Sequence, residues 1–263
     1  MLNKLLKYDL KYMIKNMSVF YILVLFFSIT TRILFSINQS VIVSIIGQIS
    51  VGCMFSMIAN ILINVVMRSW VRFRDSIYKD ESYLTHTLPV TKNDIYNSKF
   101  IQALIFFIVS FIIIVISLFI AYYTKDRWIL LKNYINSITT GLGINTLLFV
   151  ISMIIVIFLE IFNAIQSGFL GIILGYKRNN NKIGFSMLFG FIAYLLSQSI
   201  VLLLLFIVGL FNSNIMNLFK SNIILTDGTF KLLVILAIIL YLIIIGLMSI
   251  ICKIVFNKGV NIE

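Results

Sequence analysis

The chain has 263 residues, of which 61% are hydrophobic and only 11% are charged. A soluble domain carries roughly 25% charged residues, so this composition excludes a soluble globular fold. The formal net charge of +12 does not indicate a nucleic-acid-binding protein, because the basic residues lie between apolar runs and form no basic domain.

Apolar runs of the length that crosses a bilayer recur along the chain. About 20 apolar residues cross the ~30 Å hydrocarbon layer as a helix. The sequence therefore predicts an all-α polytopic membrane protein, with residues 1–263 as a single transmembrane domain. The six predicted spans cover residues 17–37, 41–67, 100–123, 144–166, 183–211 and 231–253. The other predicted segments are an interfacial helix (1–16), a cytosolic coupling loop (68–99) and a cytosolic tail (254–263).

The distribution of basic residues predicts the orientation. Fifteen of the 21 Lys and Arg residues fall before span 1, between spans 2 and 3, between spans 4 and 5, and at or after the last residue of span 6. Basic residues are concentrated on the cytosolic side of membrane proteins, so both termini are expected in the cytosol. Abundant Ile, Asn, Lys, Phe and Tyr, with scarce Ala and Pro, indicate AT-rich codons and hence the plasma membrane of a low-GC bacterium.

Residues 1–16 are predicted to form a separate amphipathic helix along the lipid headgroups. The basic face is made of Lys4, Lys7, Lys11 and Lys15. Asp9 interrupts the apolar face, and a buried carboxylate requires a partner. The expected partner is Arg68 or Arg72 in the long loop, and the alternative is a solvated Asp9 near the interface.

Two predicted spans carry a stripe of small and polar residues at four-residue spacing. Span 2 contains Ser44, Gln48, Gly52, Ser56, Asn60, Asn64 and Arg68, and span 5 contains Ser186, Gly190, Tyr194 and Gln198. One interpretation is ordinary helix packing. The other is a substrate path at a dimer interface, lined by Gln48, Ser56, Asn60, Asn64, Tyr194 and Gln198.

The long loop between spans 2 and 3 contains an amphipathic pattern. Trp70, Phe73, Ile77 and Leu84 recur at helical spacing among charged residues, which predicts a helix of about three turns. Pro89 should end this helix. Thr91 and Asp94 have the spacing of an N-terminal cap and should begin the helix that enters span 3.

Two charged residues fall in the interior of predicted spans, away from the first and last residues. Arg32 lies near the outer end of span 1 and can extend its side chain to the headgroups. Glu160 lies in span 4, where a carboxylate suggests a functional site. The two interpretations of Glu160 are a structural pair with Lys or Arg near the inner headgroups and a proton-relay group.

Catalytic motifs are missing from the sequence. It contains no P-loop, no H-E-x-x-H and no G-x-S-x-G. The single histidine, His86, has no partner for metal binding or for a catalytic triad. We therefore expect no enzyme activity, no metal and no cofactor on this chain.

The segment Leu88-Pro89-Val90-Thr91-Lys92-Asn93-Asp94, followed by Lys99, resembles a pattern of ABC-2-type permeases. The basic N-terminal helix, the six spans and the long loop are also similar to small permeases of this type from low-GC Gram-positive bacteria. The resemblance implies a dimer of permease chains, homo- or heterodimeric, and separate P-loop ATPase subunits that bind ATP and Mg.

The resemblance further implies that the coupling helix falls within residues 71–84. Its ATPase-coupling residues would be Phe73, Ile77, Tyr78, Asp80, Glu81 and Leu84. We expect Phe73, Ile77 and Tyr78 to dock into a groove of the ATPase. The outer loop at 212–230 is short, unlike the re-entrant helices of larger members.

The favoured function is an ATP-driven exporter of an amphipathic or hydrophobic compound, such as an antimicrobial peptide or antibiotic. The partners would be the ATPase, a second permease chain and the lipid bilayer, with no nucleic acid. The alternatives are a peptide-immunity or sensor protein that does not transport and a proton-coupled transporter that uses Glu160.

Overall fold

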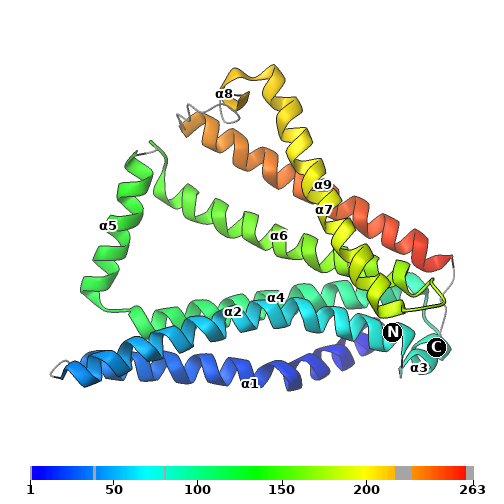
Figure 1. Cartoon of the computed structure of the whole chain (residues 1–263), viewed down its shortest axis with the longest axis horizontal. Helices are drawn as coiled ribbons and strands as arrows, with labels where there is room; N and C mark the ends of the chain where they lie inside the picture. Colours follow the sequence, from blue (N-terminus) through cyan, green and yellow to red (C-terminus); the bar gives the residue numbers. More distant parts are fainter. Residues whose placement is uncertain (1, 38–39, 80, 142, 217–226, 259–263) are drawn as a thin grey trace. The chain divides into compact units, whose positions relative to one another are not determined.

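The computed structural model describes all residues except 1, 38–39, 80, 142, 217–226 and 259–263 (Figure 1). Most of the described residues are helical, and none of them forms a strand. The helices are α1 (Leu2–Ser36), α2 (Val41–Tyr78), α3 (Ser82–Thr87), α4 (Lys92–Tyr122), α5 (Lys125–Gly141), α6 (Thr146–Gly175), α7 (Lys182–Phe211), α8 (Ser213–Met216) and α9 (Asp227–Asn257). Within this part of the chain, six helices (α1, α2, α4, α6, α7 and α9) are long and apolar enough to cross a membrane, as the sequence predicts.

Several of these helices extend beyond the predicted spans. α2 continues to Tyr78, α4 begins at Lys92 and α6 continues to Gly175. All three extensions are at the ends that the sequence predicts to be cytosolic. Hydropathy marks where a helix leaves the apolar layer, whereas the backbone hydrogen bonds end only at a capping or helix-breaking residue.

The prediction of a separate N-terminal helix is wrong. Residues 2–16 are helical, but they continue into the first span as one helix, α1. The junction around Asn16 contains neither Gly nor Pro, so nothing in the sequence interrupts the backbone hydrogen bonds. Asn16 also donates to the backbone oxygen of Tyr12, at 3.0 Å, within the helix.

The prediction of one separate helix of about three turns within residues 71–84 is also wrong. The first part of this segment is the end of α2, the second part belongs to the short helix α3, and Lys79 between them leaves the helical conformation. The predicted stop and start signals are correct, because α3 ends before Pro89 and Thr91 caps α4. The Thr91 hydroxyl accepts from the Asp94 amide at 3.2 Å and donates to Asp94 Oδ2 at 2.7 Å.

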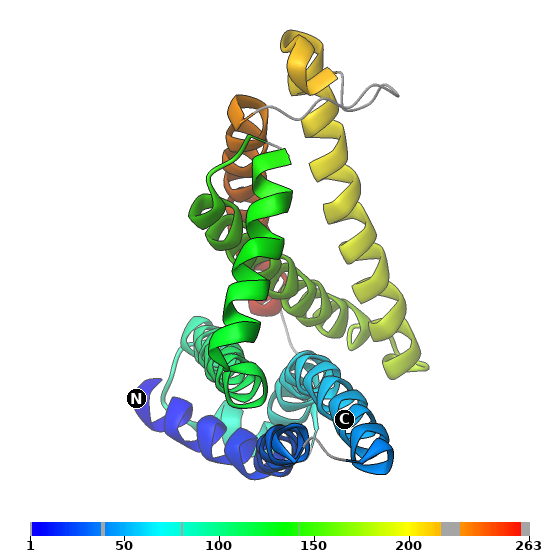
Figure 2. The ribbon, with the colours of Figure 1, turned by 90° about the vertical axis from the view of Figure 1, so that its left-hand side faces the viewer.

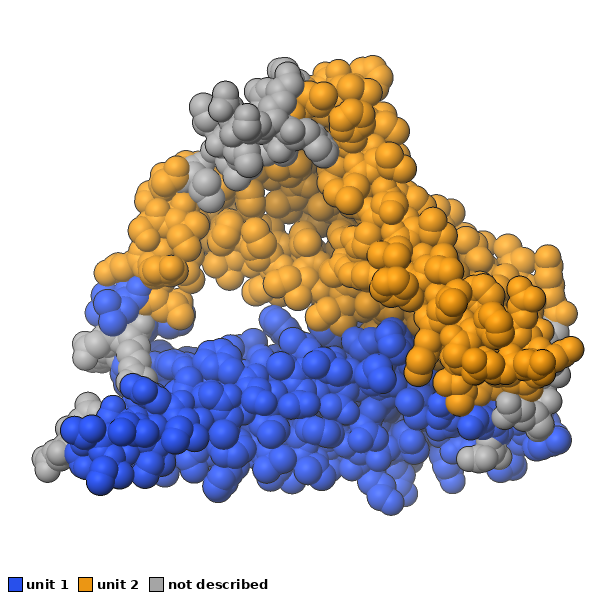
Figure 3. Space-filling view, viewed as in Figure 1, with its two compact units in different colours: residues 1–130 blue, residues 131–263 orange. Residues whose placement is uncertain are grey.

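The chain divides into two compact units, residues 1–130 and 131–263 (Figure 3). In the first unit, α1, α2 and α4 pack against one another, and Figure 2 views them nearly end-on. Hydroxyl groups join these helices: Tyr21 and Ser110 are hydrogen-bonded at 2.6 Å, and Thr31 and Ser50 at 2.9 Å. Such polar contacts are common between membrane helices.

In the second unit, α6 packs against both α7 and α9. Gly171 and Gly175 allow α7 to approach closely, because a Cβ atom at either position would collide with Gly190 or Ser186 of α7. These four residues form a packing contact of the small-residue type. Ser186 and Gly190 belong to the stripe of span 5, so the packing interpretation is correct for these two residues.

The helix α5 lies between predicted spans 3 and 4, in a segment for which the sequence predicted no element. Its apolar residues recur at helical spacing (Trp128, Leu131, Tyr134 and Ile138) and are exposed. The boundary between the two compact units falls within this helix.

Candidate functional site

Asp9 is the centre of a buried ion network in the first unit. Its side chain lies on α1 and is 1% exposed. Oδ1 accepts from Arg72 Nε of α2 at 2.8 Å and from Lys99 Nζ of α4 at 2.6 Å. Ser98 donates a longer bond to Oδ2, at 3.4 Å. The predicted pairing of Asp9 with Arg72 is therefore confirmed.

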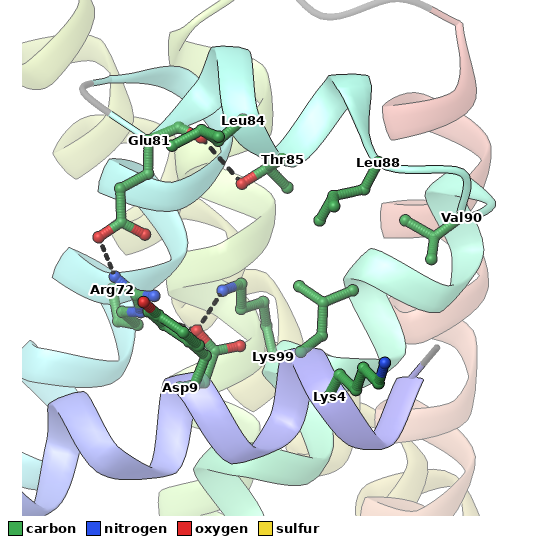
Figure 4. Close-up of a pocket in the computed structure, with 11 residues that line it drawn as sticks. Lys4, Asp9, Arg72, Glu81, Leu84, Thr85, Leu88, Val90 and Lys99 are labelled. Carbon is green, nitrogen blue, oxygen red and sulfur yellow. Dashed lines mark hydrogen bonds and ion pairs between the residues drawn. The ribbon is translucent and has the colours of Figure 1, made fainter.

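Arg72 connects Asp9 to the segment between α2 and α4. Its Nη1 donates to Glu81 Oε1 at 2.7 Å, and Glu81 immediately precedes α3. Figure 4 shows the Arg72 side chain between those of Asp9 and Glu81. The guanidinium also lies over the ring of Tyr12 on α1, 4.5 Å from its centroid, which is cation–π geometry. Arg72 thus contacts both α1 and the start of α3.

Lys99 is the partner that sequence reasoning missed. It is buried on α4, one turn after the buried Ile95 and Tyr96. Two acidic and two basic side chains (Asp9, Glu81, Arg72 and Lys99) therefore balance one another. Loss of one member of a buried pair leaves an uncompensated charge, which costs about 3–5 kcal/mol.

A cavity of about 440 Å³ adjoins this network (Figure 4). Leu84, Leu88 and Val90 line it together with Leu5 of α1, and the ion network supplies most of its polar wall. Lys4, Tyr8 and Thr85 complete the lining. The walls therefore come from α1, α2, the segment around α3, and α4.

The predicted coupling residues have two different environments. Phe73, Ile77 and Tyr78 are buried within the first unit, so they cannot dock onto another protein directly, and that expectation is wrong. Phe73 packs edge-to-face on Tyr96 of α4, with ring centroids 6.3 Å apart. An amphipathic pattern predicts that a face is covered, and here the chain itself covers it.

The exposed side chains lie on α3 instead. Leu84 is 71% exposed and its neighbour Tyr83 is 68% exposed. Glu81, which precedes this helix, keeps 46% of its side chain exposed while it binds Arg72. His86 holds the other end of α3, because its Nε2 lies 3.1 Å from the backbone oxygen of Ile77. Asp80 lies outside the described residues.

Some polar side chains of the α2 stripe form their hydrogen bonds within their own helix. Gln48 and Ser56 are exposed, whereas Asn60 and Asn64 are half-buried. The side-chain amide of Asn60 donates to the backbone oxygen of Ser56 at 3.0 Å. The side-chain amide of Asn64 donates to the backbone oxygen of Asn60 at 2.9 Å. These residues belong to the first unit and the α7 residues to the second, so the shared substrate cavity stays a prediction.

Tyr194 and Gln198 of α7 contact Glu160 of α6 within the second unit. The Tyr194 hydroxyl donates to Glu160 Oε1 at 2.6 Å, and the Gln198 amide donates to the same oxygen at 2.7 Å. One of the two interpretations of Glu160 is a structural pair with Lys or Arg. Its partners in the structure are instead a phenol and an amide.

Arg32 binds the end of another helix. Its Nη1 donates to the backbone oxygens of Ile120 and Tyr123, at 3.1 and 2.9 Å. The last carbonyl groups of a helix have no partner within it, and a nearby cation stabilises them. Arg32 therefore caps α4, a contact that its position in span 1 did not predict.

Within the described residues, no group of three His, Cys, Asp or Glu side chains could hold a metal ion. A scan against protein-family models found no matching family, and searches of curated proteins and of solved structures found no match.

Proposed function

We propose that this chain is the permease subunit of an ATP-driven exporter in a bacterial plasma membrane, with both termini in the cytosol. The observation that carries the proposal is the network of Glu81, Arg72, Asp9 and Lys99. It connects the exposed helix α3 to three long apolar helices, α1, α2 and α4. A displacement of α3 therefore has a direct ionic route to these helices.

In this proposal, a separate P-loop ATPase binds the exposed side chains of α3. Tyr83, Leu84 and Leu88 supply an apolar contact surface, and such surfaces mark interaction sites. The buried Phe73, Ile77 and Tyr78 hold the end of α2 against α4 rather than contacting the ATPase. Nucleotide-driven movement of α3 then repositions Glu81 and shifts the helices attached to Arg72.

The sequence supports the assignment of ATP binding to a partner and of transport to this chain. The chain has no nucleotide-binding motif, so ATP and Mg bind the partner and the energy must be delivered mechanically. The segment Leu88–Lys99, which carries the resemblance to ABC-2-type permeases, includes the chain that leaves α3, the Thr91 cap and the buried Lys99.

The test uses the chain purified together with a P-loop ATPase encoded in a neighbouring reading frame. The double substitution Tyr83→Ser and Leu84→Ser should weaken complex formation and abolish substrate-stimulated ATP hydrolysis. Leu130→Ser on α5 is the matched control, because Leu130 is similarly exposed but lies outside α3. Unchanged assembly and hydrolysis in the double variant would contradict the docking surface.

A second arm tests the ATP dependence itself. Export or protection of cells should be lost when the P-loop lysine of the partner is replaced. Protection that persists without hydrolysis would contradict the exporter and favour an immunity or sensor protein. Transport that persists and follows a proton gradient would favour the proton-coupled alternative.

A further inference from the structure

The polar cluster around Glu160 lies at the middle of three apolar helices of the second unit. Glu160 is halfway along α6, roughly 20 Å from either end at a rise of 1.5 Å per residue. Tyr194 and Gln198 flank the midpoint of α7, and Tyr241 lies at the middle of α9. Ionisable groups at this depth in membrane helices are rare and mark functional sites.

The hydrogen bonds to Glu160 are unevenly distributed between its two oxygens. Tyr194 and Gln198 both donate to Oε1, and the Tyr241 hydroxyl donates to Gln198 Oε1 at 3.4 Å. Oε2 is buried and has no hydrogen-bond partner among the described residues. One carboxylate oxygen is therefore positioned by α7. The other is buried near the Tyr241 hydroxyl, which interacts with the carboxylate, but it accepts no hydrogen bond from the described residues.

The same arrangement occurs at the next polar position of α6. Asn163 is fully buried, and its amide nitrogen donates to Ser197 Oγ at 2.8 Å. The Ser197 hydroxyl donates its proton to the Tyr194 backbone oxygen, so it can only accept from Asn163. Asn163 Oδ1 is consequently an acceptor, and it too has no partner among the described residues.

Gln166 repeats the pattern three residues later. It is fully buried, its Nε2 donates to Ser249 of α9 at 2.6 Å, and its Oε1 has no partner in the described part of the chain. Glu160, Asn163 and Gln166 therefore present three buried acceptor oxygens along α6, over about 9 Å and about 120° of rotation. Each amide nitrogen is satisfied, so the deficit consists of acceptors only.

A surplus of acceptors that includes a carboxylate selects one kind of ligand. Buried acceptors are costly in a membrane unless a donor reaches them. An anion or an ether would bring further acceptors, whereas an ammonium or guanidinium group brings N–H donors and a compensating charge.

We infer that Glu160 Oε2, with Asn163 Oδ1 beyond it, binds the ammonium or guanidinium group of an amphipathic molecule. Gln166 Oε1 extends the line of acceptors one step further along α6. This inference rests on the proposed function and specifies it, because it makes the exported substrate an amphipathic cation.

The first test is direct binding by the chain alone, in lipid nanodiscs without an ATPase. The probes are dodecylammonium and dodecylguanidinium, and dodecanol is the neutral control at the same mole fraction in the lipid. Glu160→Gln preserves the size of the side chain and should weaken binding of both cations at least about tenfold. Binding of dodecanol should not change, and an unchanged affinity for both cations would overturn the inference.

The second test needs no variant, so it decides the question if Glu160→Gln does not fold. Dicyclohexylcarbodiimide modifies carboxyl groups within bilayers, and peptide mass spectrometry measures its reaction at Glu160. Both cations should protect Glu160, and dodecanol should not. Equal protection by dodecanol, or no protection by the cations, would mean that the cluster is structural.

The two proposals can fail separately. Cation-selective binding by a chain that never assembles with an ATPase would support the site and contradict the exporter. ATP-dependent export of a neutral compound, with no cation binding at Glu160, would support the exporter and contradict the site.

Discussion

Asp9 and Lys99 are 90 residues apart in the sequence, yet Asp9 Oδ1 and Lys99 Nζ lie 2.6 Å apart in the structure. Both side chains are buried, and Arg72 binds the same carboxylate oxygen. A single carboxylate thus pairs with cations from two different helices, and Glu81 supplies the second negative charge. Asp9 therefore joins α1 to both α2 and α4 at this end.

The substitution Asp9→Asn should destabilise the protein by about 3–5 kcal/mol, because Arg72 and Lys99 would be left buried and mutually repulsive. The additional change Lys99→Met should recover part of this loss, since it removes one unpaired cation. The measurement is the free energy of unfolding in detergent. Lys7→Met, at an exposed position of α1, should change stability by less than about 0.5 kcal/mol. Additive effects of the two network substitutions would argue against the coupling.

The substitution Glu81→Gln should reduce the coupling of transport to ATP hydrolysis more than it reduces the stability of the protein. Its pair with Arg72 is half-exposed, and exposed pairs contribute about 1 kcal/mol or less. The complex should still assemble and hydrolyse ATP, but transport per ATP should fall because α3 loses its bond to Arg72. Parallel export and hydrolysis assays measure this ratio.

The matched control for Glu81 is Asp75→Asn. Asp75 forms a pair with Arg74 near the same end of α2, at 2.8 Å, but this pair joins adjacent residues and no other helix. Transport per ATP should therefore be preserved in Asp75→Asn. A similar loss in both variants would indicate a general charge effect instead of a specific relay.

Sequence reasoning identified Asp9 because burial of a charge obliges it to have a partner. It found Arg72, which lies near the start of the predicted long loop, but not Lys99, which lies at the end of that loop. Hydropathy cannot tell which face of α4 turns toward α1, since that register depends on packing. The same limit explains the wrong prediction that Phe73 and Ile77 dock onto an ATPase. An amphipathic pattern does not say whether this chain or another protein covers the apolar face.

The hydrogen-bond partners of Glu160 were not predicted for a related reason. The sequence showed the carboxylate, and it showed Tyr194 and Gln198 one helical turn apart on span 5. It did not show that the close contact at Gly171 and Gly175 sets the register of α6 against α7 and so brings those side chains to Glu160. Contacts between helices far apart in sequence are not encoded in the periodicity of either helix.

The contact between α6 and α7 predicts that alanine substitutions at two glycines have different effects on stability. Gly171→Ala places a methyl group against the backbone of Gly190, which cannot yield without moving α7. The expected destabilisation is about 1–3 kcal/mol. Gly246→Ala on α9 meets no atom within 4 Å and should be neutral or stabilising by up to about 1 kcal/mol. Thermal unfolding of the two variants measures the difference, and equal effects would contradict the close approach.

Comparison of Asn60→Leu with Gln198→Leu tells whether these polar residues line a substrate path or serve helix packing. The Asn60 amide donates only to a backbone oxygen of its own helix, whereas Gln198 donates to Glu160 on another helix. Gln198→Leu should therefore destabilise the protein by about 1–3 kcal/mol, because a bond to a charged group is lost. Asn60→Leu should leave stability and assembly nearly unchanged.

Transport then decides the role of the α2 stripe. If the exposed Gln48 and Ser56 and the half-buried Asn60 line a path, Asn60→Leu should change the transport rate or the substrate range of a stable complex. Leu203→Asn on α7 is the converse control, since it places an amide at an exposed apolar position outside both stripes and should reduce stability without selecting among substrates. An Asn60→Leu variant that is stable, assembles and transports every substrate normally would remove the α2 stripe from the path. In that case the amides at Asn60 and Asn64 would serve only their own helix, through the bonds they already donate to the oxygens of Ser56 and Asn60.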